Sequence, residues 1–287
     1  GRFNDMYLIC MKGYYNMDLT SPRTIRNIQE QFGFTFKKGL GQNFLTARNI
    51  LEEIVDAAEI ESGVIEVGPG FGVLTSELAQ NSDKVVTIEI DERLIDVLDY
   101  TLAEYDNVKI INEDILKLDL KKVIDDEFNG EKVSIAANLP YYITTPIITK
   151  LLEEKLPIKN IVVMVQKEVA ERMSAKPSTK DYGAITVLCQ YYTEPSIVAN
   201  VPASLFVPPP KVDSAVLKLK VLDKPSVEVK DEGVFFRVVK AAFSQRRKTL
   251  LNCLSANFPI PKDEISTLLE SIGIAPSRRG ETLSLKE

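Results

Sequence analysis

Short apolar runs alternate with amphipathic stretches along the first two thirds of the chain. These runs lie at residues 63–67, 85–90, 108–111, 133–137 and 161–165. Their length and lack of polar alternation are typical of strands buried on both faces, whereas Val73–Asn81 has apolar residues at helical spacing. Strands that alternate with helices predict an α/β fold with a mostly parallel, doubly wound sheet. Ligands of such sheets bind beyond the carboxyl ends of the strands.

The pattern changes after Val201. Prolines interrupt it before an alternating run at residues 212–219, which predicts a further strand. From Gly233 onward the spacing predicts helices over 234–254 and 261–272. We therefore expect a catalytic domain over residues 21–223 and a small all-helical domain over 224–287. Residues 1–20 have no features of a signal peptide, and we expect them to be a disordered or artificial leader.

Composition excludes several classes of function. No apolar run approaches the length of a membrane span, so we expect no membrane partner. The three cysteines, Cys10, Cys189 and Cys253, are scattered, which favours a reducing cytoplasm. The chain has no histidine, which excludes a Ser-His-Asp triad and a histidine-based zinc site, and we expect no metal.

The net charge of −6 is unevenly distributed. Residues 1–48 hold seven Lys/Arg against three Asp/Glu, and residues 224–287 hold eleven against eight. Basic flanks on an acidic body can face phosphate, although ordinary surface charge explains the distribution equally well.

Polar and glycine residues follow the predicted strands. Gly68-Pro69-Gly70-Phe71-Gly72 follows the first, and its glycines are closer together than in a dinucleotide site. This spacing favours a ligand without pyrophosphate, such as the methionyl part of S-adenosylmethionine, although ordinary strand–helix junctions can also carry such a turn. Glu89 is placed to accept ribose hydroxyls or to cap a helix. Asp114 and the main-chain N–H of Ile115 could bind an adenine, although Asp114 could equally be a loop acid or a helix cap.

Asn138-Leu139-Pro140-Tyr141 follows the fourth strand. An exocyclic amine is a poor nucleophile, so a site that alkylates it must hold the base and accept hydrogen bonds from the NH2 group. The side-chain oxygen of Asn138, the main-chain oxygen of Leu139 turned by rigid Pro140, and the Tyr141 ring supply these parts. This segment predicts adenine N6-methylation by an enzyme that depends on S-adenosylmethionine.

Three further segments contain residues that could bind a ligand or RNA. Residues 37–45 combine lysines, glycines and the pair Gln42-Asn43, which suits either a lid over a polar ligand or a flexible leader. Phe206 and Lys211 flank a run of three prolines, which suits a second stacking ring beside a phosphate contact, or a core Phe at a linker. The run Arg246-Arg247-Lys248 is either a solvated helix face or an RNA contact.

Together these segments resemble the ribosomal RNA adenine dimethyltransferase family over about residues 37–280. The motifs that carry the resemblance are GQNFL (41–45), EVGPGFGVLT (66–75), VTIEID (86–91), NEDIL (112–116), NLPYYI (138–143), FVPPPKVDSAV (206–216) and FSQRRKTL (243–250). The resemblance implies a Rossmann-like methyltransferase domain with an antiparallel last strand, and a helical domain that helps to seat RNA. It also implies dimethylation of two adjacent adenosines near the 3′ end of small-subunit rRNA during subunit maturation.

The resemblance also implies roles for individual residues. Cofactor contacts are implied for Asn43, Leu45, Gly68, Gly70, Glu89, Asp114 and Asn138, and we expect them also for Gln42 and Ile115. Asn138 and the Leu139–Pro140 main chain would hold the target amine, and Tyr141 and Phe206 would enclose the target ring. From their charge, we expect Lys211 and Arg246-Arg247-Lys248 to contact RNA. The expected partner is the immature small ribosomal subunit, and we expect a monomer.

Alternatives remain open at this stage. A large-subunit rRNA adenine methyltransferase shares the Asn-x-Pro-Tyr logic, and a DNA adenine methyltransferase is a weaker rival. The protein could also act chiefly as a non-catalytic ribosome-assembly factor. A nicotinamide oxidoreductase is disfavoured by the glycine spacing.

Overall fold

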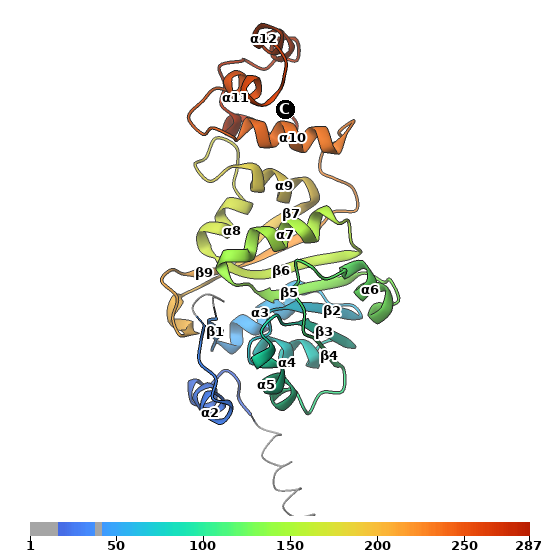
Figure 1. Ribbon diagram of the computed structural model, residues 1–287, viewed down its shortest axis with the longest axis vertical. Coiled ribbons are helices and arrows are strands. Elements are labelled where there is room, and N and C mark those ends of the chain that lie inside the picture. The colour runs from blue at the N-terminus through green and yellow to red at the C-terminus, as the bar shows by residue number, and fades with distance from the viewer. Residues whose placement is uncertain (1–16, 38–41) are drawn as a thin grey trace, which may run out of the picture. The chain divides into compact units, whose positions relative to one another are not determined.

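The chain forms two compact units in a computed structural model that describes residues 17–37 and 42–287 (Figure 1). Unit 1 runs to Lys167 and resumes over Ile197–Lys220. Unit 2 consists of Glu168–Ser196 and Val221–Glu287, so residues 168–196 belong to the same unit as the C-terminal helices. The predicted catalytic role of residues 21–223 and the predicted RNA-binding role of residues 224–287 stay predictions.

A twisted sheet is the main element of the fold. Within the described residues its strand order is β4-β3-β2-β5-β6-β9-β7. The strands are β2 (Gly63–Val67), β3 (Lys84–Ile88), β4 (Val108–Ile111), β5 (Val133–Asn138), β6 (Ile158–Gln166), β7 (Thr193–Val201) and β9 (Ser214–Val221). Strands β4, β3, β2, β5 and β6 are parallel to one another, and β9 is antiparallel to β6. The predicted α/β class and the antiparallel last strand are confirmed.

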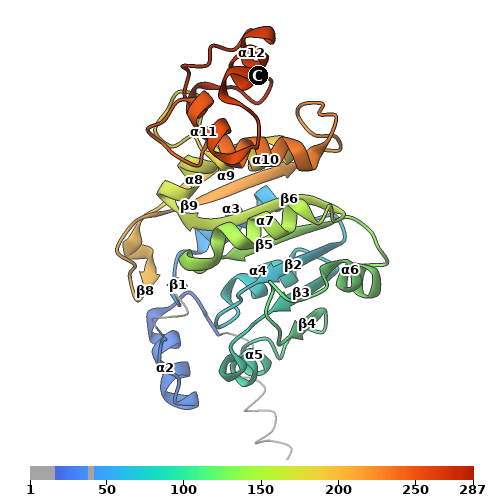
Figure 2. The ribbon, with the colours of Figure 1, turned by 45° about the horizontal axis from the view of Figure 1, so that its top comes forward.

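Helices cover both faces of the sheet, so its central strands β2 and β5 are buried. The helices are α3 (Arg48–Ala58), α4 (Val73–Gln80), α5 (Ile95–Thr101), α6 (Leu120–Phe128) and α7 (Thr144–Glu153), with short 3₁₀ helices η2 (Glu92–Leu94), η3 (Tyr141–Ile143) and η4 (Ala203–Leu205). Helices α3 and α7 lie on opposite faces of the sheet (Figure 2). Asp91 caps η2 by accepting a hydrogen bond from the main-chain N–H of Arg93.

A second, very small sheet joins segments that are far apart in the sequence. Strand β1 (Phe44–Leu45) pairs antiparallel with β8 (Phe206–Val207), with Leu45 opposite Phe206. Before β1 lies α2 (Pro22–Phe32), and Leu19, which falls in the predicted leader, is buried in the same apolar cluster as α2 residues. Residues 1–16 and 38–41 lie outside the described residues, and they include most of the predicted leader and the glycines of the lid motif.

The helices of unit 2 come from the middle and from the C-terminal part of the chain. They are α8 (Lys167–Met173, whose first residue ends unit 1), α9 (Ala184–Tyr192), α10 (Glu232–Ala242), α11 (Leu250–Asn257), α12 (Lys262–Ser271) and the 3₁₀ helix η5 (Gly280–Thr282). The single helix predicted over 234–254 is wrong, because a turn at 243–249 divides it. The polar run in this turn has no apolar face to bury, and the Thr249 hydroxyl caps α11 by accepting from the main-chain N–H of Asn252.

The described part of the chain contains no helix that is long and apolar enough to cross a membrane. Among the same residues, no three His, Cys, Asp or Glu side chains are grouped as metal ligands.

Candidate active site

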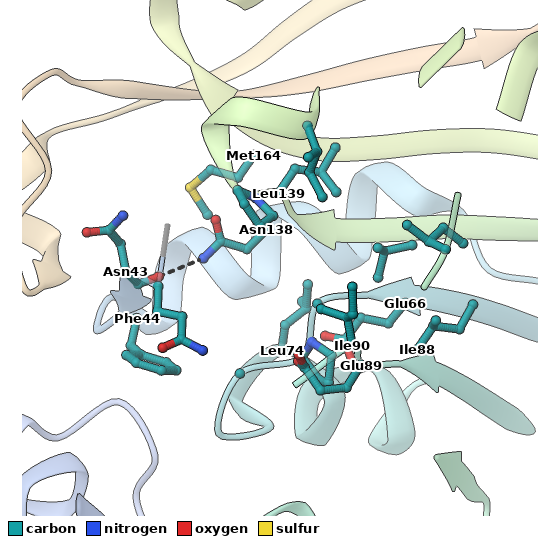
Figure 3. Close-up of a pocket in the computed structure, with 18 of the residues that line it drawn as sticks. Asn43, Phe44, Glu66, Leu74, Ile88, Glu89, Ile90, Asn138, Leu139 and Met164 are labelled. Atoms are coloured by element: carbon teal, nitrogen blue, oxygen red, sulfur yellow. Dashed lines mark hydrogen bonds between the residues drawn. The ribbon is translucent and has the colours of Figure 1, made fainter. Parts of the chain in front are cut away.

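One cavity of unit 1 lies at the carboxyl ends of the parallel strands. The turn after β2, Glu89 after β3, Asp114 after β4 and Asn138 at the end of β5 all line it. Figure 3 shows Glu89 and Asn138 at this cavity. Parallel strands place their carboxyl ends at one edge of a sheet, which is why residues spread over some seventy positions meet there. Every residue predicted to be catalytic or to bind the cofactor lines this cavity.

Two glycines of the turn, Gly68 and Gly70, are needed for different physical reasons. Gly68 has φ +70°, and a Cβ placed on it would meet only the main-chain oxygen of Asn138, at 3.7 Å. Gly70 has φ +58°, and a Cβ there would lie 2.6 Å from the Phe44 ring. The turn therefore leaves space at Gly68 for a ligand, whereas Gly70 allows Phe44 to approach the backbone.

Phe44 belongs to a cluster of four aromatic rings that fixes the segment before α3. Its ring stacks on Phe71 with centroids 4.3 Å apart, and Phe34 and Phe36 pack around this pair. The cluster joins the segment that we predicted to be a lid directly to the glycine turn.

Two carboxyl groups at the cavity are deeply buried. Glu66 is 1% exposed and accepts hydrogen bonds from the hydroxyls of Thr75 and Thr87. Glu89 accepts from the main-chain N–H of Asp91 at 3.0 Å. Burial raises the pKa of each carboxyl to about 7, and the charge of Glu89 adds to the effect at Glu66. A cation in the cavity would favour the ionised form of both.

Two further predicted cofactor residues, Asp114 and Gln42, are held by hydrogen bonds within the protein. Asp114 accepts from the main-chain N–H of Leu116 at 2.9 Å, which fixes the turn that carries buried Ile115. The Gln42 amide donates to Asp91 at 3.1 Å and accepts from the main-chain N–H of Lys37 at 3.1 Å. Gln42 thereby joins the lid segment to the loop after β3.

The Asn138 amide is oriented by the lid segment. Its Nδ2 donates to the main-chain oxygen of Asn43 at 3.2 Å (Figure 3). With the nitrogen engaged in this way, Oδ1 is the atom that can accept from a bound amine. Leu139 is buried and its N–H donates to the main-chain oxygen of Met164, which fixes the direction of the following turn.

Aromatic rings line the same part of the cavity. The hydroxyl of half-buried Tyr141 lies 2.8 Å from that of Ser214 on β9. Phe206 is 3% exposed and is held by the pairing of β8 with β1. The neighbouring Tyr142 is 55% exposed and also lines the cavity.

The predicted RNA contacts lie outside the cavity. Lys211 is exposed in unit 1, in the loop before β9. Arg246, Arg247 and Lys248 are exposed in unit 2, in the turn between α10 and α11 rather than on a helix face.

Several residues of the site were missed from the sequence. Glu66, Phe44, Met164, Tyr142 and Ser214 each line the cavity or hold a residue that does. Glu66 could have been found as the last acid before the glycine turn. Phe44, Tyr142 and Ser214 lie inside the motifs that carry the family resemblance, and Met164 lies outside them, but the contacts of all four depend on the fold.

Comparison with known proteins gives consistent results. Residues 33–286 match the family described as ribosomal RNA adenine dimethylase. Proteins named ribosomal RNA small subunit methyltransferase A, from Bacillus mycoides (strain KBAB4) and Bacillus cereus (strain AH187), are each 55% identical to this chain over 276 residues, with 94% of both chains covered.

Solved structures of the same kind are similar. A dimethyladenosine transferase from Plasmodium falciparum has a TM-score of 0.69 at 30% identity, covering 84% of this chain and 93% of its own. The 23S rRNA methyltransferase ErmE has a TM-score of 0.64 at 27% identity, covering 84% of this chain and 95% of its own.

Proposed function

From the premise that this chain belongs to the ribosomal RNA adenine dimethylase family, we propose how its cavity performs the methyl transfer. The protein is a small-subunit rRNA adenine dimethyltransferase that uses S-adenosylmethionine. The observation that carries the proposed site is that residues predicted separately to bind the cofactor and the target amine line one cavity.

The cavity fits a cationic, adenosine-containing cofactor. The carboxyl groups of Glu66 and Glu89 are buried beside the cavity, and burial disfavours their ionised forms. A positively charged cofactor would stabilise both carboxylates. Glu89 would also accept ribose hydroxyls, and Asp114 with Ile115 would bind the adenine edge. Gly68 leaves room for the methionyl part.

The bound cofactor supplies an electrophilic methyl group on a sulfonium, which becomes a neutral thioether when the carbon–sulfur bond breaks. Asn138 Oδ1 and the main-chain oxygen of Leu139 accept hydrogen bonds from the N6 amino group as the new carbon–nitrogen bond forms. One N6 proton then leaves to solvent. A strong base is not required, since positioning and these acceptors lower the barrier.

Tyr141 and Phe206 hold the target ring between them. The hydrogen bond to Ser214 fixes the Tyr141 hydroxyl, and the β1–β8 pairing fixes Phe206. Both rings are therefore positioned before the base arrives, so little conformational freedom is lost on binding. The second transfer needs one acceptor and room for the first methyl group to rotate.

The finer details of the substrate follow the family. We propose that the enzyme modifies two adjacent adenosines near the 3′ end of the rRNA, on the immature subunit, and that it acts as a cytoplasmic monomer. Lys211 and Arg246-Arg247-Lys248 would contact phosphate groups.

Two alternatives are weaker. Modification of large-subunit rRNA is disfavoured because the chain is 55% identical to small-subunit methyltransferases and 27% identical to a 23S rRNA methyltransferase. A purely structural role in ribosome assembly does not account for oriented hydrogen-bonding groups at Asn138 and Tyr141.

Methyl transfer to purified subunits tests the proposal. Small subunits that lack the modification are incubated with the protein and isotopically labelled cofactor, and their nucleosides are analysed by mass spectrometry. We expect labelled N6,N6-dimethyladenosine from small subunits and none from large subunits. Label only in large-subunit RNA, or in neither, would refute it.

A further inference from the structure

Two segments of unit 2 carry exposed cations without carboxylate partners. Lys176 and Lys180 lie in the loop between α8 and α9, and Arg246-Arg247-Lys248 lies in the turn between α10 and α11. Among the described residues no Asp or Glu lies within ion-pair distance of any of these five cations, whereas Arg172 in the same unit pairs with Glu168. These cations are not neutralised by the protein itself.

Hydrogen bonds to main-chain oxygens hold the two segments side by side. The Arg246 guanidinium donates to the main-chain oxygen of Lys180, 66 positions away in the sequence. Arg279 donates in turn to the main-chain oxygen of Arg246 at 2.8 Å. The loop is also fixed at Ser178, whose N–H donates to the main-chain oxygen of Glu281 at 2.7 Å.

Holding the two segments together places their cations near one another, and the repulsion between these charges does not stabilise the folded protein. Cations that are brought together without carboxylates repel one another, and each exposed charge remains available to an external anion. Arg279 differs from the five, because Glu281 pairs with it at 2.8 Å. Five cations without an ion-pair partner therefore lie on two segments that a hydrogen bond joins.

We propose that residues 176–180 and 246–248 form one composite surface that binds the phosphate groups of RNA, with Lys176 and Lys180 as contacts. In this part of the chain, the sequence alone predicted RNA contacts only at residues 246–248. This inference rests on the proposed function, because small-subunit rRNA is the polyanion that the enzyme must hold. Arg246 serves the surface chiefly as the connection between its two parts.

Salt-dependent binding to purified small ribosomal subunits tests this surface. The variant is Lys176→Ala/Lys180→Ala, and the charge-matched control is Lys224→Ala/Lys262→Ala, which removes two exposed cations of unit 2 outside the two segments. We expect the first variant to bind about tenfold more weakly. The negative slope of log K against log salt should become shallower by about 1.4, the value for two lost phosphate contacts on single-stranded nucleic acid. The control and Lys176→Arg/Lys180→Arg should bind as the wild type does.

The possible failures are distinguishable. In one failure, the wild type binds and methylates small subunits, but the Lys176→Ala/Lys180→Ala variant binds equally well or the charge-matched control loses as much affinity as the variant. That result would overturn the composite surface and leave the proposed function intact. A wild-type protein that neither binds nor methylates small subunits would overturn the proposed function itself. Thermal unfolding and cofactor affinity of each variant, both expected to be unchanged, exclude misfolding as the cause of a loss.

Discussion

At the scale of single residues, the cavity consists of polar groups that the protein already orients. Asn43 fixes the Asn138 amide, Ser214 fixes the Tyr141 hydroxyl, and two threonine hydroxyls hold Glu66. Groups that are fixed before the substrate binds need little reorganisation during the reaction. The predictions at this scale therefore concern orientation and charge.

Asn138→Ala should reduce the single-turnover rate about 10²- to 10³-fold, because one acceptor for the N6 hydrogens is lost. Cofactor affinity should change far less, since Glu89 and Asp114 are retained. Rapid-quench methylation assays with saturating cofactor measure the rate, and calorimetry measures the affinity. An undiminished single-turnover rate would contradict the role of Asn138.

Tyr141→Phe and Ser214→Ala should each slow the reaction about fivefold, because either change removes the same hydrogen bond of about 1 kcal/mol. The double variant should be no slower than the slower single variant. Tyr141→Leu should be slower than any of them, because the stacking ring itself is lost. Additive losses in the double variant would show that the two hydroxyls act independently.

Glu66→Gln should change how stability depends on pH. The folded-state pKa is about 7, above the usual 4.5, so the native state retains a proton that the unfolded chain loses. The free energy of unfolding should therefore fall as pH rises from about 4.5 to 7, by roughly 3 kcal/mol for this group, and level off above. Glutamine keeps an acceptor for Thr75 and Thr87 and cannot ionise.

Urea unfolding of the cofactor-free protein at pH 5 and pH 8 measures the effect. Glu66→Gln should match the wild type at pH 5 and exceed its stability at pH 8. Glu89, whose pKa is also raised to about 7, should retain part of the pH dependence in the variant. Parallel pH profiles for the two proteins would contradict the assigned pKa of Glu66.

At the scale of elements, contacts between short segments complete the site. Strand β1 pairs with β8, and the Thr46 N–H and hydroxyl both donate to the main-chain oxygen of Leu205, at 2.8 Å and 2.7 Å. The glycine turn supports the same region through Phe44. Disturbing the turn should therefore affect both stability and ligand binding.

Gly70→Ala tests this contact, with Gly33→Ala as its matched control. Both glycines have φ close to +58°, but a Cβ at Gly33 meets nothing within 4 Å, whereas at Gly70 it meets the Phe44 ring at 2.6 Å. The control should lose about 1 kcal/mol of stability from backbone strain alone. Gly70→Ala should lose at least 1 kcal/mol more, since Phe44 must move.

Urea unfolding and cofactor titration measure both effects. Only Gly70→Ala should also weaken cofactor binding, because Phe44 lies in the segment that supplies Gln42, Asn43 and Leu45. Equal stability losses and unchanged cofactor affinity in both variants would contradict the proposed support of the lid segment by the turn.

At the scale of the whole molecule, the two units carry different chemistry. The cavity residues all belong to unit 1, whereas the unpaired cation clusters at 176–180 and 246–248 belong to unit 2. Cofactor binding and RNA binding should therefore respond to different changes.

Arg247→Ala/Lys248→Ala should weaken binding to small ribosomal subunits about tenfold and reduce its salt dependence, because two phosphate contacts are lost. Cofactor affinity measured by calorimetry should be unchanged, because neither residue lines the cavity. A variant that binds subunits as tightly as the wild type at every salt concentration would remove these residues from the RNA interface.

The sequence by itself determined the fold class and most of the cavity. Buried parallel strands must be apolar throughout, and their carboxyl ends must meet at one edge, so local patterns predicted where Glu89, Asp114 and Asn138 would converge. The Gly68-x-Gly70-x-Gly72 turn was visible because positive φ angles favour glycine. The assignment to adenine methylation came from the chemistry of Asn138–Tyr141 and from the family resemblance.

Only the tertiary structure decided which distant groups hold these residues. Ser214 reaches Tyr141 across 73 positions, and Phe44 is adjacent to Gly70 because β1 and the glycine turn pack together. The contact between Arg246 and Lys180 likewise depends on what surrounds it. Such contacts have no local period or composition, because they are set by how the elements pack rather than by neighbours in the chain.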